Sequence, residues 1–206
     1  MKRLPLSPAA LALVSLGLLS LGGLSACVAP VGPVEVTRFH VADTAPLGRG
    51  AITVEPAAQV DGTSLEYRTY AAAVARQLVL LGYAEQPAGT ASPQIALVRV
   101  ERSTIAPQPT GGPVSVGVGG GTGSFGSGLG VGIGVNLSGP PPEQTATELS
   151  VTIRDRASGS ALWEGRARFV VRSDSPMAQT SLGAAKLAEA LFKGFPGVSG
   201  QTIEVR

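Results

Sequence analysis

Residues 148–172 read ELSVTIRDRASGSALWEGRARFVVR, and this stretch decides the fold. Apolar and polar residues alternate on both sides of Ser158-Gly159, a pair that favours a tight turn. Alternation with a period of two is typical of a strand with one buried face, so the stretch predicts an antiparallel hairpin. Its apolar row comprises Leu149, Val151, Ile153, Trp163, Ala167, Phe169 and Val171.

The opposite face of this hairpin is rich in arginine. It carries Arg154, Arg156, Arg166, Arg168 and Arg172, together with Glu148 and Glu164. Five guanidinium groups on one side of two paired strands form a candidate binding face for an anionic polymer, such as a glycan, or for a lipid headgroup. An open antiparallel sheet normally has one solvated face, so a plain polar surface is the alternative interpretation.

Two helices flank the hairpin in the sequence. The first begins at a Thr-x-x-Glu capping box, Thr63–Glu66, and the glycine at position 82 marks its end. The second begins at Asp174 or Ser175 and has Pro176 at its first position.

Four further strands are predicted at 34–41, 52–55, 94–103 and 202–205. This order of elements predicts an α+β fold, a two-layer α/β sandwich with a mostly antiparallel sheet and two helices on one face. The expected core between the layers consists of Tyr70, Val74, Leu78, Leu81, Val151, Ile153, Trp163, Phe169, Leu191 and Phe192.

A glycine-rich insert at residues 111–139 interrupts this order, and 13 of its 29 residues are glycine. Valine, leucine and isoleucine nevertheless alternate along it, which favours a β-hairpin over a mobile loop or a segment that orders only on binding. Such a hairpin has one apolar row that needs cover and one bare face. We therefore expect residues 113–137 to be dispensable for folding and to mediate self-association or contact with an envelope partner.

The N-terminus has the pattern of a bacterial lipoprotein signal. Lys2 and Arg3 precede an apolar run, and Leu24-Ser25-Ala26-Cys27 fits a lipobox. We predict a lipid on Cys27, which would hold the protein on a membrane. The alternatives are an uncleaved membrane helix, which normally needs about 20 apolar residues, and a plain cleaved signal with an incidental cysteine.

This interpretation divides the chain into three parts. Residues 1–26 are the signal peptide, residues 27–33 are a lipidated tether, and residues 34–206 are a single domain that contains the insert. Lipoproteins that stay in the inner membrane of Gram-negative bacteria typically have aspartate after the cysteine. Val28 therefore favours the periplasmic face of the outer membrane.

The charge of the mature chain argues against nucleic acid as a partner. The precursor has 16 Lys and Arg against 14 Asp and Glu, and two of the cations leave with the signal, so 14 stand against 14. Without net positive charge, the mature chain gives no electrostatic argument for nucleic acid as a partner.

Catalytic and metal-binding patterns are not evident. His40 is the only histidine, whereas catalytic zinc sites normally use several His or Cys ligands. Gly121-Thr-Gly123-Ser-Phe-Gly126 fits G-x-G-x-x-G, but a second glycine run comes after it where a dinucleotide site needs a helix. We expect no catalytic residue, no metal and no cofactor.

Several segments carry a family resemblance by their order. Behind the lipobox come Gly50-Ala-Ile-Thr-Val-Glu-Pro56, Leu80-Leu-Gly-Tyr83 and Asp155-x-x-Ser-Gly159-x-x-Leu-Trp163-x-Gly165. Over about residues 34–205 the chain resembles the bacterial envelope lipoproteins grouped as domain of unknown function 4136. The resemblance implies an α/β lipoprotein without an established activity and carries over no catalytic residues.

These observations lead to an expected function. We expect a non-enzymatic, outer-membrane-anchored periplasmic lipoprotein with a structural or partner-binding role in the envelope. A periplasmic binding module for an anionic glycan or lipid headgroup is the alternative, and a hydrolase is the third interpretation.

Overall fold

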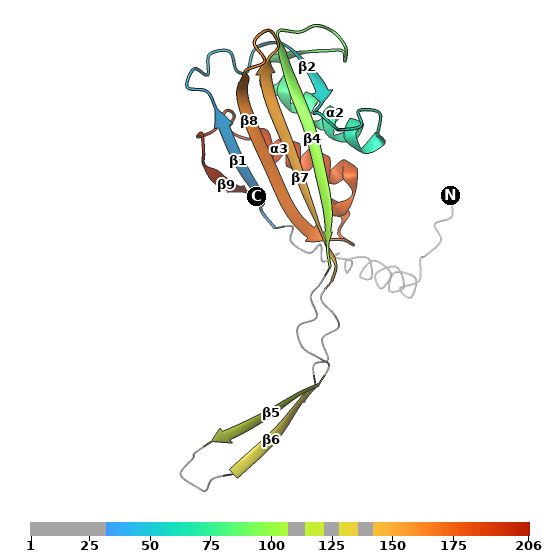
Figure 1. Ribbon diagram of the computed structural model, residues 1–206, viewed down its shortest axis with the longest axis vertical. Helices are drawn as coiled ribbons and strands as arrows, with labels where there is room; N and C mark the ends of the chain where they lie inside the picture. The colour runs from blue at the N-terminus through green and yellow to red at the C-terminus, as the bar shows by residue number, and fades with distance from the viewer. Residues whose placement is uncertain (1–31, 107–113, 122–127, 136–141) are drawn as a thin grey trace, which may run out of the picture. The chain divides into compact units, whose positions relative to one another are not determined.

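The computed structural model describes residues 32–106, 114–121, 128–135 and 142–206. Its main body is a seven-stranded sheet in the order β3-β2-β4-β7-β8-β1-β9 (Figure 1). The strands of this sheet are β1 (Val34–His40), β2 (Gly50–Pro56), β3 (Tyr83–Gln86), β4 (Gln94–Ile105), β7 (Gln144–Asp155), β8 (Ala161–Arg172) and β9 (Thr202–Val205). The helices are α2 (Leu65–Leu80) and α3 (Thr180–Phe192), with a single 3-10 turn, η1 (Pro176–Ala178), before α3.

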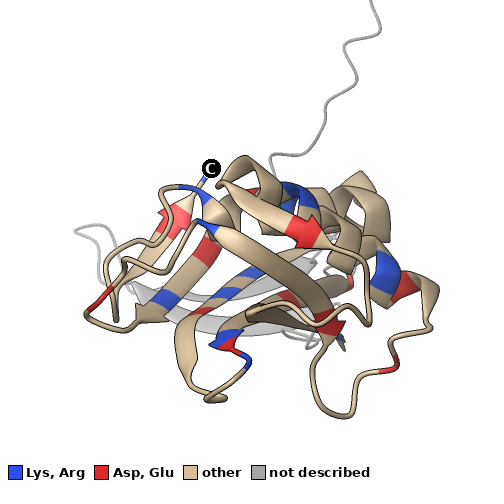
Figure 2. Ribbon diagram, turned by 90° about the horizontal axis from the view of Figure 1, so that it is seen from above, with Lys and Arg blue, Asp and Glu red and all other residues tan. Residues whose placement is uncertain are grey.

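The sheet is mixed but mostly antiparallel. The pairs β4–β7, β7–β8, β8–β1 and β1–β9 are antiparallel, and β2 runs parallel to both β3 and β4. Both helices lie on one face of the sheet, and the described residues place no helix on the other (Figure 2). The predicted α+β fold with two helices on one face is confirmed.

The core lies between the helices and the sheet. Nine of the ten predicted core residues are buried, and Leu81 is half-buried at the C-terminal cap of α2. The Trp163 ring stacks on Phe192 with centroids 5.4 Å apart and contacts Phe195 at 5.2 Å. Since burial of one large apolar side chain contributes about 1.5–3 kcal/mol, this cluster is a major source of stability.

Strand β3 was not predicted. It has four residues, too few for a clear alternation, and only Tyr83 among them is buried. It forms because the chain leaves α2 beside the free edge of β2, where Gly50 to Thr53 pair with Tyr83 to Gln86. A short strand of this kind depends on the neighbour that supplies its hydrogen bonds.

Helix α2 begins one residue later than predicted. The N-cap is Ser64, whose Oγ accepts a hydrogen bond from the backbone N–H of Tyr67 at 3.1 Å. Thr63 instead donates from Oγ1 to Asp61 at 2.7 Å, so the predicted Thr63 cap was wrong. Two capping residues stand side by side, and the extended backbone at Ser64 selects between them. Gly82, at φ +104°, ends the helix as predicted.

The second helix is also displaced. Ser175 caps the 3-10 turn that begins with Pro176, and its side chain accepts a hydrogen bond from the backbone N–H of Met177. Gln179 then returns to an extended conformation, and α3 begins at Thr180. A start of this α-helix at Asp174 or Ser175 was therefore wrong, because a Ser-Pro pair opens a single turn as readily as a long helix.

The insert contains a separate two-stranded antiparallel sheet of β5 (Val114–Gly121) and β6 (Gly128–Val135). The rest of the insert lies outside the described residues. So do the predicted signal peptide, Cys27 and most of the predicted tether. Among the helices of the described residues, none is both long enough and apolar enough to cross a membrane.

Candidate functional site

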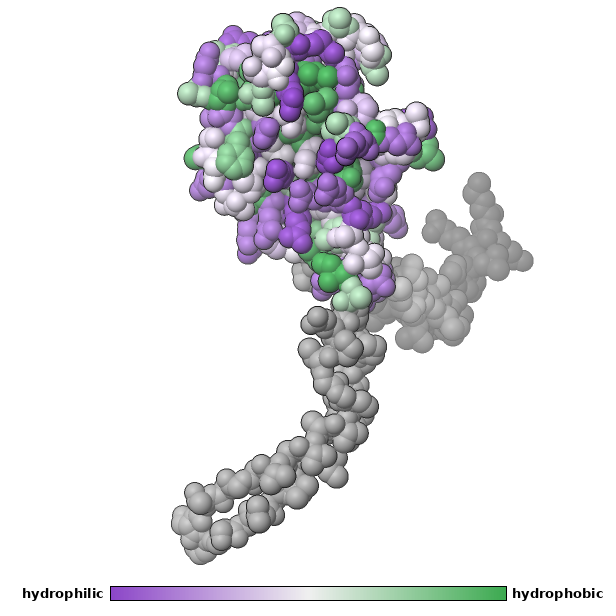
Figure 3. Space-filling model, in the orientation of Figure 1, coloured by the Kyte–Doolittle hydropathy of each residue, from purple (hydrophilic) through white to green (hydrophobic). Residues whose placement is uncertain are grey.

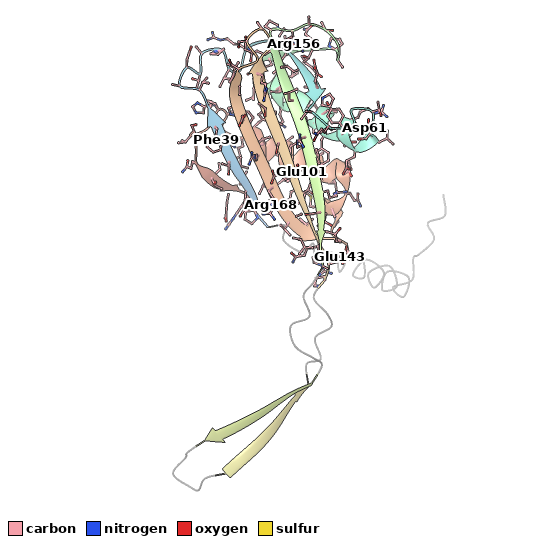
Figure 4. All side chains as sticks on the ribbon, viewed as in Figure 1. Phe39, Asp61, Glu101, Glu143, Arg156 and Arg168 are labelled. Carbon is pink, nitrogen blue, oxygen red and sulfur yellow. The ribbon has the colours of Figure 1, made fainter. Side chains whose placement is uncertain are left out.

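The side of the seven-stranded sheet that faces away from the helices is here called the open face. It is built from alternate residues of β1, β4, β7 and β8, whose neighbours in sequence point into the core. Hydrophilic residues cover much of this face (Figure 3). Figure 4 labels Glu101 on β4 and Arg168 on β8.

Cross-strand register arranges the open face in rows from β4 to β1. The first row consists of Glu101, Glu148, Arg168 and Glu35. The second row consists of Arg99, Ser150, Arg166 and Thr37. Three carboxylates and one guanidinium therefore lie beside a row with two guanidiniums, so both signs of charge alternate within a short distance.

A hollow of about 560 Å³ lies on this face, over β4, β7 and β8. Ser150 and Thr152 on β7 lie among its lining residues, and Ser150 Oγ donates to Glu148 Oε1 over 3.4 Å. The charged residues that line it are Arg99, Arg154, Arg166, Glu101, Glu148 and Glu164. The hollow thus presents hydroxyl groups between three guanidiniums and three carboxylates.

The structure brings three of the five predicted arginines together. Arg154, Arg166 and Arg168 are exposed on the open face. Arg156 belongs instead to a cluster at the end of β2, and Arg172 binds Asp174 at 2.6 Å. The hydrogen bond from Arg172 holds the pKa of the Asp174 carboxyl below its usual value.

Arg156 is held by several groups at once. Its Nη2 lies 2.5 Å from Glu55 Oε1 and donates to Thr53 Oγ1 at 2.7 Å, and its Nε donates to the Ser92 carbonyl at 2.9 Å. Thr53 and Ser92 are buried beneath it. This arginine holds β2 and the segment before β4 together, so it has less capacity to bind a ligand than the three on the face.

Sequence reasoning missed the residues that β4 and β1 add to the face. Arg99 and Glu101 come after a buried run on β4, and Glu35 and Phe39 alternate with core residues on β1. Phe39 is 52% exposed and lies beside Glu164 of β8. The alternation of polar and apolar residues in β4 and β1 is evident in the sequence. The strand order, which places β4 and β1 on either side of the β7–β8 hairpin, is not.

A second hollow, of about 810 Å³, lies at the sheet edge between β2, α2 and the segment after β3. Ala71, Ala72 and Ala75 of α2 line it, with Tyr67 and the Arg156 cluster beside them. Burial and the negative charge of Glu55 raise the pKa of Tyr67 to about 12, so its hydroxyl stays protonated. It is available as a hydrogen-bond donor and not as a base.

The lone histidine lies apart from both hollows. His40 Nδ1 lies 2.8 Å from the Val41 carbonyl oxygen and Nε2 lies 3.2 Å from that of Gly197. Among the residues that the structure describes, no three His, Cys, Asp or Glu side chains lie together as metal ligands. The G-x-G-x-x-G match begins at the last residue of β5 and otherwise lies outside the described residues.

The fold and the face define a class: α+β proteins with one helix-covered sheet whose second face is open and charged. Within that class the chain belongs to the DUF4136 family, described as a domain of unknown function, whose model matches residues 36–197. The resemblance to this family that the sequence showed is thereby confirmed. The chain is also similar to the uncharacterised protein ZMO1243 of Zymomonas mobilis, with 31% identity over 84% of this chain and 80% of that protein.

Solved structures align with the chain more distantly. A PDZ domain protein from Parabacteroides distasonis aligns with a TM-score of 0.48 and 11% identity, over 95% of this chain and 41% of that one. This chain therefore spans less than half the length of that protein. PelC, a dodecamer in crystals of the Paraburkholderia phytofirmans protein, aligns with a TM-score of 0.39 and 12% identity, over 75% of this chain and 91% of that one.

Proposed function

We propose that this protein is a non-enzymatic, lipid-anchored protein of the outer membrane that binds a second envelope protein through the open face. The run Leu24–Cys27 behind a basic and apolar leader supports the anchor. Several acyl chains on one cysteine hold a protein stably at a membrane while its body stays in water. Val28 supports the outer membrane, with the body on the periplasmic side.

The mixture of charges on the open face carries the proposal. An anionic polymer that approaches the guanidiniums of the hollow also approaches three carboxylates, and the attraction is largely cancelled. A protein segment with charges of both signs finds an opposite charge in each row. Electrostatic complementarity of this kind fixes the orientation of a partner and rejects those with the wrong pattern.

An anionic glycan or lipid headgroup is the second candidate. Arg154, Arg166 and Arg168 favour it, since they are exposed and form no ion pair with other described residues. A guanidinium binds carboxylate or phosphate through paired hydrogen bonds. This candidate predicts that only the arginines of the open face matter for binding.

The chemistry of the hollow supports a binding role more than a hydrolytic one. Activation of Ser150 or Thr152 as a nucleophile needs a base within hydrogen-bonding distance. The hydrogen bond from Ser150 to Glu148 is 3.4 Å long, which exceeds the roughly 2.6–3.2 Å between a nucleophile and its base. The hollow has no histidine or cysteine among its lining residues. The carboxylates instead lie among guanidiniums on an open surface.

The anchor is tested with a Cys27→Ser variant of the whole chain. The wild-type protein, extracted in detergent, should exceed the mass of residues 27–206 by acyl chains, and the variant should leave the membrane fraction or remain unprocessed. A variant that is processed and stays in the membrane as the wild type does would refute the lipid anchor.

The open face is tested by charge reversal in cells. A photoreactive amino acid at position 39 reports contact, because the side chain of Phe39 is half exposed at the rim of the face. One variant carries Arg99→Glu with Arg166→Glu, and the other carries Glu101→Arg with Glu148→Arg. Arg76→Glu with Glu189→Arg, both exposed on the helices, is the matched control.

A mixed-charge protein partner predicts that both reversals abolish a discrete protein adduct, whereas the control retains it. An anionic ligand predicts that the arginine reversal alone removes the adduct and that the glutamate reversal strengthens it. If both charge-reversal variants keep the adduct, the open face is not the binding site. Melting curves of all variants establish that the fold is intact.

A further inference from the structure

The two edges of the seven-stranded sheet are protected. Edge strands β3 and β9 have four residues each, and Glu85 and Glu204 place an exposed charge on them. Short, charged edges prevent a sheet from pairing with another chain. The edge strands of the seven-stranded sheet therefore do not favour pairing with a strand of another chain.

The ribbon of β5 and β6 has neither short nor charged edge strands. Each strand has eight residues, neither contains a charge or a proline, and their register is unbroken from Val114 with Val135 to Gly121 with Gly128. The forty residues of segment 103–142 include no Asp, Glu, Lys, Arg or His, whereas 15% of the whole chain is charged. Both outer edges of the ribbon are unpaired within the described residues.

Register also separates the ribbon into two unlike faces. Directly opposed residues share a face, and one face is formed by the pairs Val114 with Val135, Val116 with Ile133, Val118 with Val131 and Gly120 with Leu129. The other face is formed by Ser115 with Gly134, Gly117 with Gly132, Gly119 with Gly130 and Gly121 with Gly128. A two-stranded ribbon is at best marginally stable in water, and further strands with a shared apolar face, or packing against a helix, are needed for independent stability.

We infer that a second copy of this chain supplies the missing strands, by antiparallel pairing of β6 with β6 across a two-fold axis at Gly132. Such an axis pairs Val131 with Ile133 and Leu129 with Val135, so apolar residues oppose apolar residues. The glycines at 130 and 134 pair likewise. The product is a four-stranded sheet with one continuous apolar face and one continuous glycine face.

Strand β6 is the better edge for this pairing. Its alternation of glycine with a larger apolar residue runs through all eight positions, whereas β5 ends in three consecutive glycines, Gly119 to Gly121. Glycine weakens a strand interior because it loses more backbone entropy than other residues. Because the sequence of β6 is complementary to itself, a second copy of this chain fits its edge. An unrelated protein would need an edge strand with the same alternation of glycine and apolar residues.

A disulfide at the axis tests the geometry in the full-length protein. Opposed residues in antiparallel strands have Cα atoms about 4.5–5.5 Å apart, within the range of a disulfide. Gly132→Cys should therefore form a cross-linked dimer on mild oxidation. Ser158→Cys, in the exposed β7–β8 turn, adds one thiol elsewhere and should not. Equal dimer formation in the two variants would overturn the axis.

A pair of lysine variants tests the edge. Gly132→Lys places two like charges on the axis and should weaken self-association at least about tenfold, because edge lysines block strand pairing. Gly117→Lys puts the same charge on the register partner of Gly132, on the far strand, and should leave association near wild type. Sedimentation in detergent measures the effect. Equal loss in both variants, a monomeric wild type, or a ribbon that cross-links only to lipid or to another protein would each refute the inference.

Discussion

Arg38 shows at the scale of a single residue what tertiary structure adds to a strand pattern. It lies on β1 with Val34 and Val36 and is only 4% exposed. Its Nε donates to the Leu191 carbonyl at 2.9 Å, and Nη2 donates to two further carbonyls at the end of α3. These carbonyls have no partner within the helix, so the arginine both caps them and complements the negative end of the helix. Burial lowers the pKa of its guanidinium.

We predict that Arg38→Met destabilises the fold by roughly 2–4 kcal/mol, because the change removes several charge-assisted hydrogen bonds and leaves buried carbonyls unpaired. Arg38→Lys should recover only part of the loss, since an ammonium cannot reproduce the fork of a guanidinium. Urea unfolding measures both. Arg76→Met on the exposed side of α2 is the control, and an equal effect there would show that Arg38 does not cap α3.

Gly165 explains the Trp-x-Gly pattern of the β8 strand. A methyl group added at this glycine would lie 2.8 Å from Cδ1 of Leu191 and 2.8 Å from Cζ2 of Trp163. The buried indole therefore occupies the space beside the glycine and cannot yield, because Phe192 and Phe195 hold it from the other side.

We predict that Gly165→Ala costs about 1–3 kcal/mol through overpacking and changes the fluorescence of Trp163, the only tryptophan. Gly32→Ala, which has nothing within 4 Å of the added methyl, is the matched control. Unchanged stability and fluorescence in the Gly165 variant would mean that the Trp163 ring does not pack as described.

At the scale of the element, the start of α2 depends on one of two adjacent hydroxyl residues. We predict that Ser64→Ala destabilises the protein by about 1 kcal/mol, because the backbone N–H of Tyr67 loses its acceptor. Thr63→Ala should cost less, since the Thr63 hydroxyl binds only the exposed Asp61. Thermal unfolding of the two variants shows which substitution lowers the stability more. A larger loss of stability in Thr63→Ala than in Ser64→Ala would support the Thr63–Glu66 capping box that the sequence predicts.

The elements that the sequence placed wrongly or did not predict share one property. The residues at the start of α2, at η1 and in β3 each suit more than one local conformation, and their neighbours in space select among them. By contrast, the 148–172 hairpin and the apolar side of α2 were predicted correctly. Their apolar periodicity is long enough to specify both the type of element and the side that is buried.

At the scale of the whole molecule, the insert is separable from the main sheet. Strands β4 and β7 pair continuously as far as Ile105 with Gln144, so a short turn can join them there. We predict that replacement of residues 113–137 by a Gly/Ser turn leaves the free energy of unfolding within about 1 kcal/mol of wild type, because loop length enters closure entropy only logarithmically. The same variant should lose self-association.

Circular dichroism melting and sedimentation of this variant separate the two effects. Loss of folding would place the insert in the core. Intact folding with undiminished self-association would refute a role for the ribbon in dimerisation.

The candidate site was only partly readable from the sequence. The alternation of the hairpin marked Arg154, Arg166 and Arg168 as outward residues, and the structure places them on the open face. The alternation did not reveal that Arg156 binds Glu55 of β2. Nor did it reveal that Arg99, Glu101 and Glu35 complete the two rows of the open face. These contacts join residues far apart in the chain, and no local periodicity records them. A face that looked cationic in one hairpin is therefore of mixed charge in the whole sheet.

The sequence by itself determined the features that depend on local periodicity: the 148–172 hairpin, the buried sides of the helices and the glycine-rich hairpin of the insert. The run Leu24–Cys27 predicts a lipid anchor in the same local way. Beyond the two hairpins, only the tertiary structure decided which strands lie next to each other, and with that the addition of β3, the burial of Arg38 and the charge pattern of the open face. The physical reason is that hydrophobic alternation specifies which side of an element is buried. It does not specify the partner that buries it, which depends on how the whole set of elements shares one core.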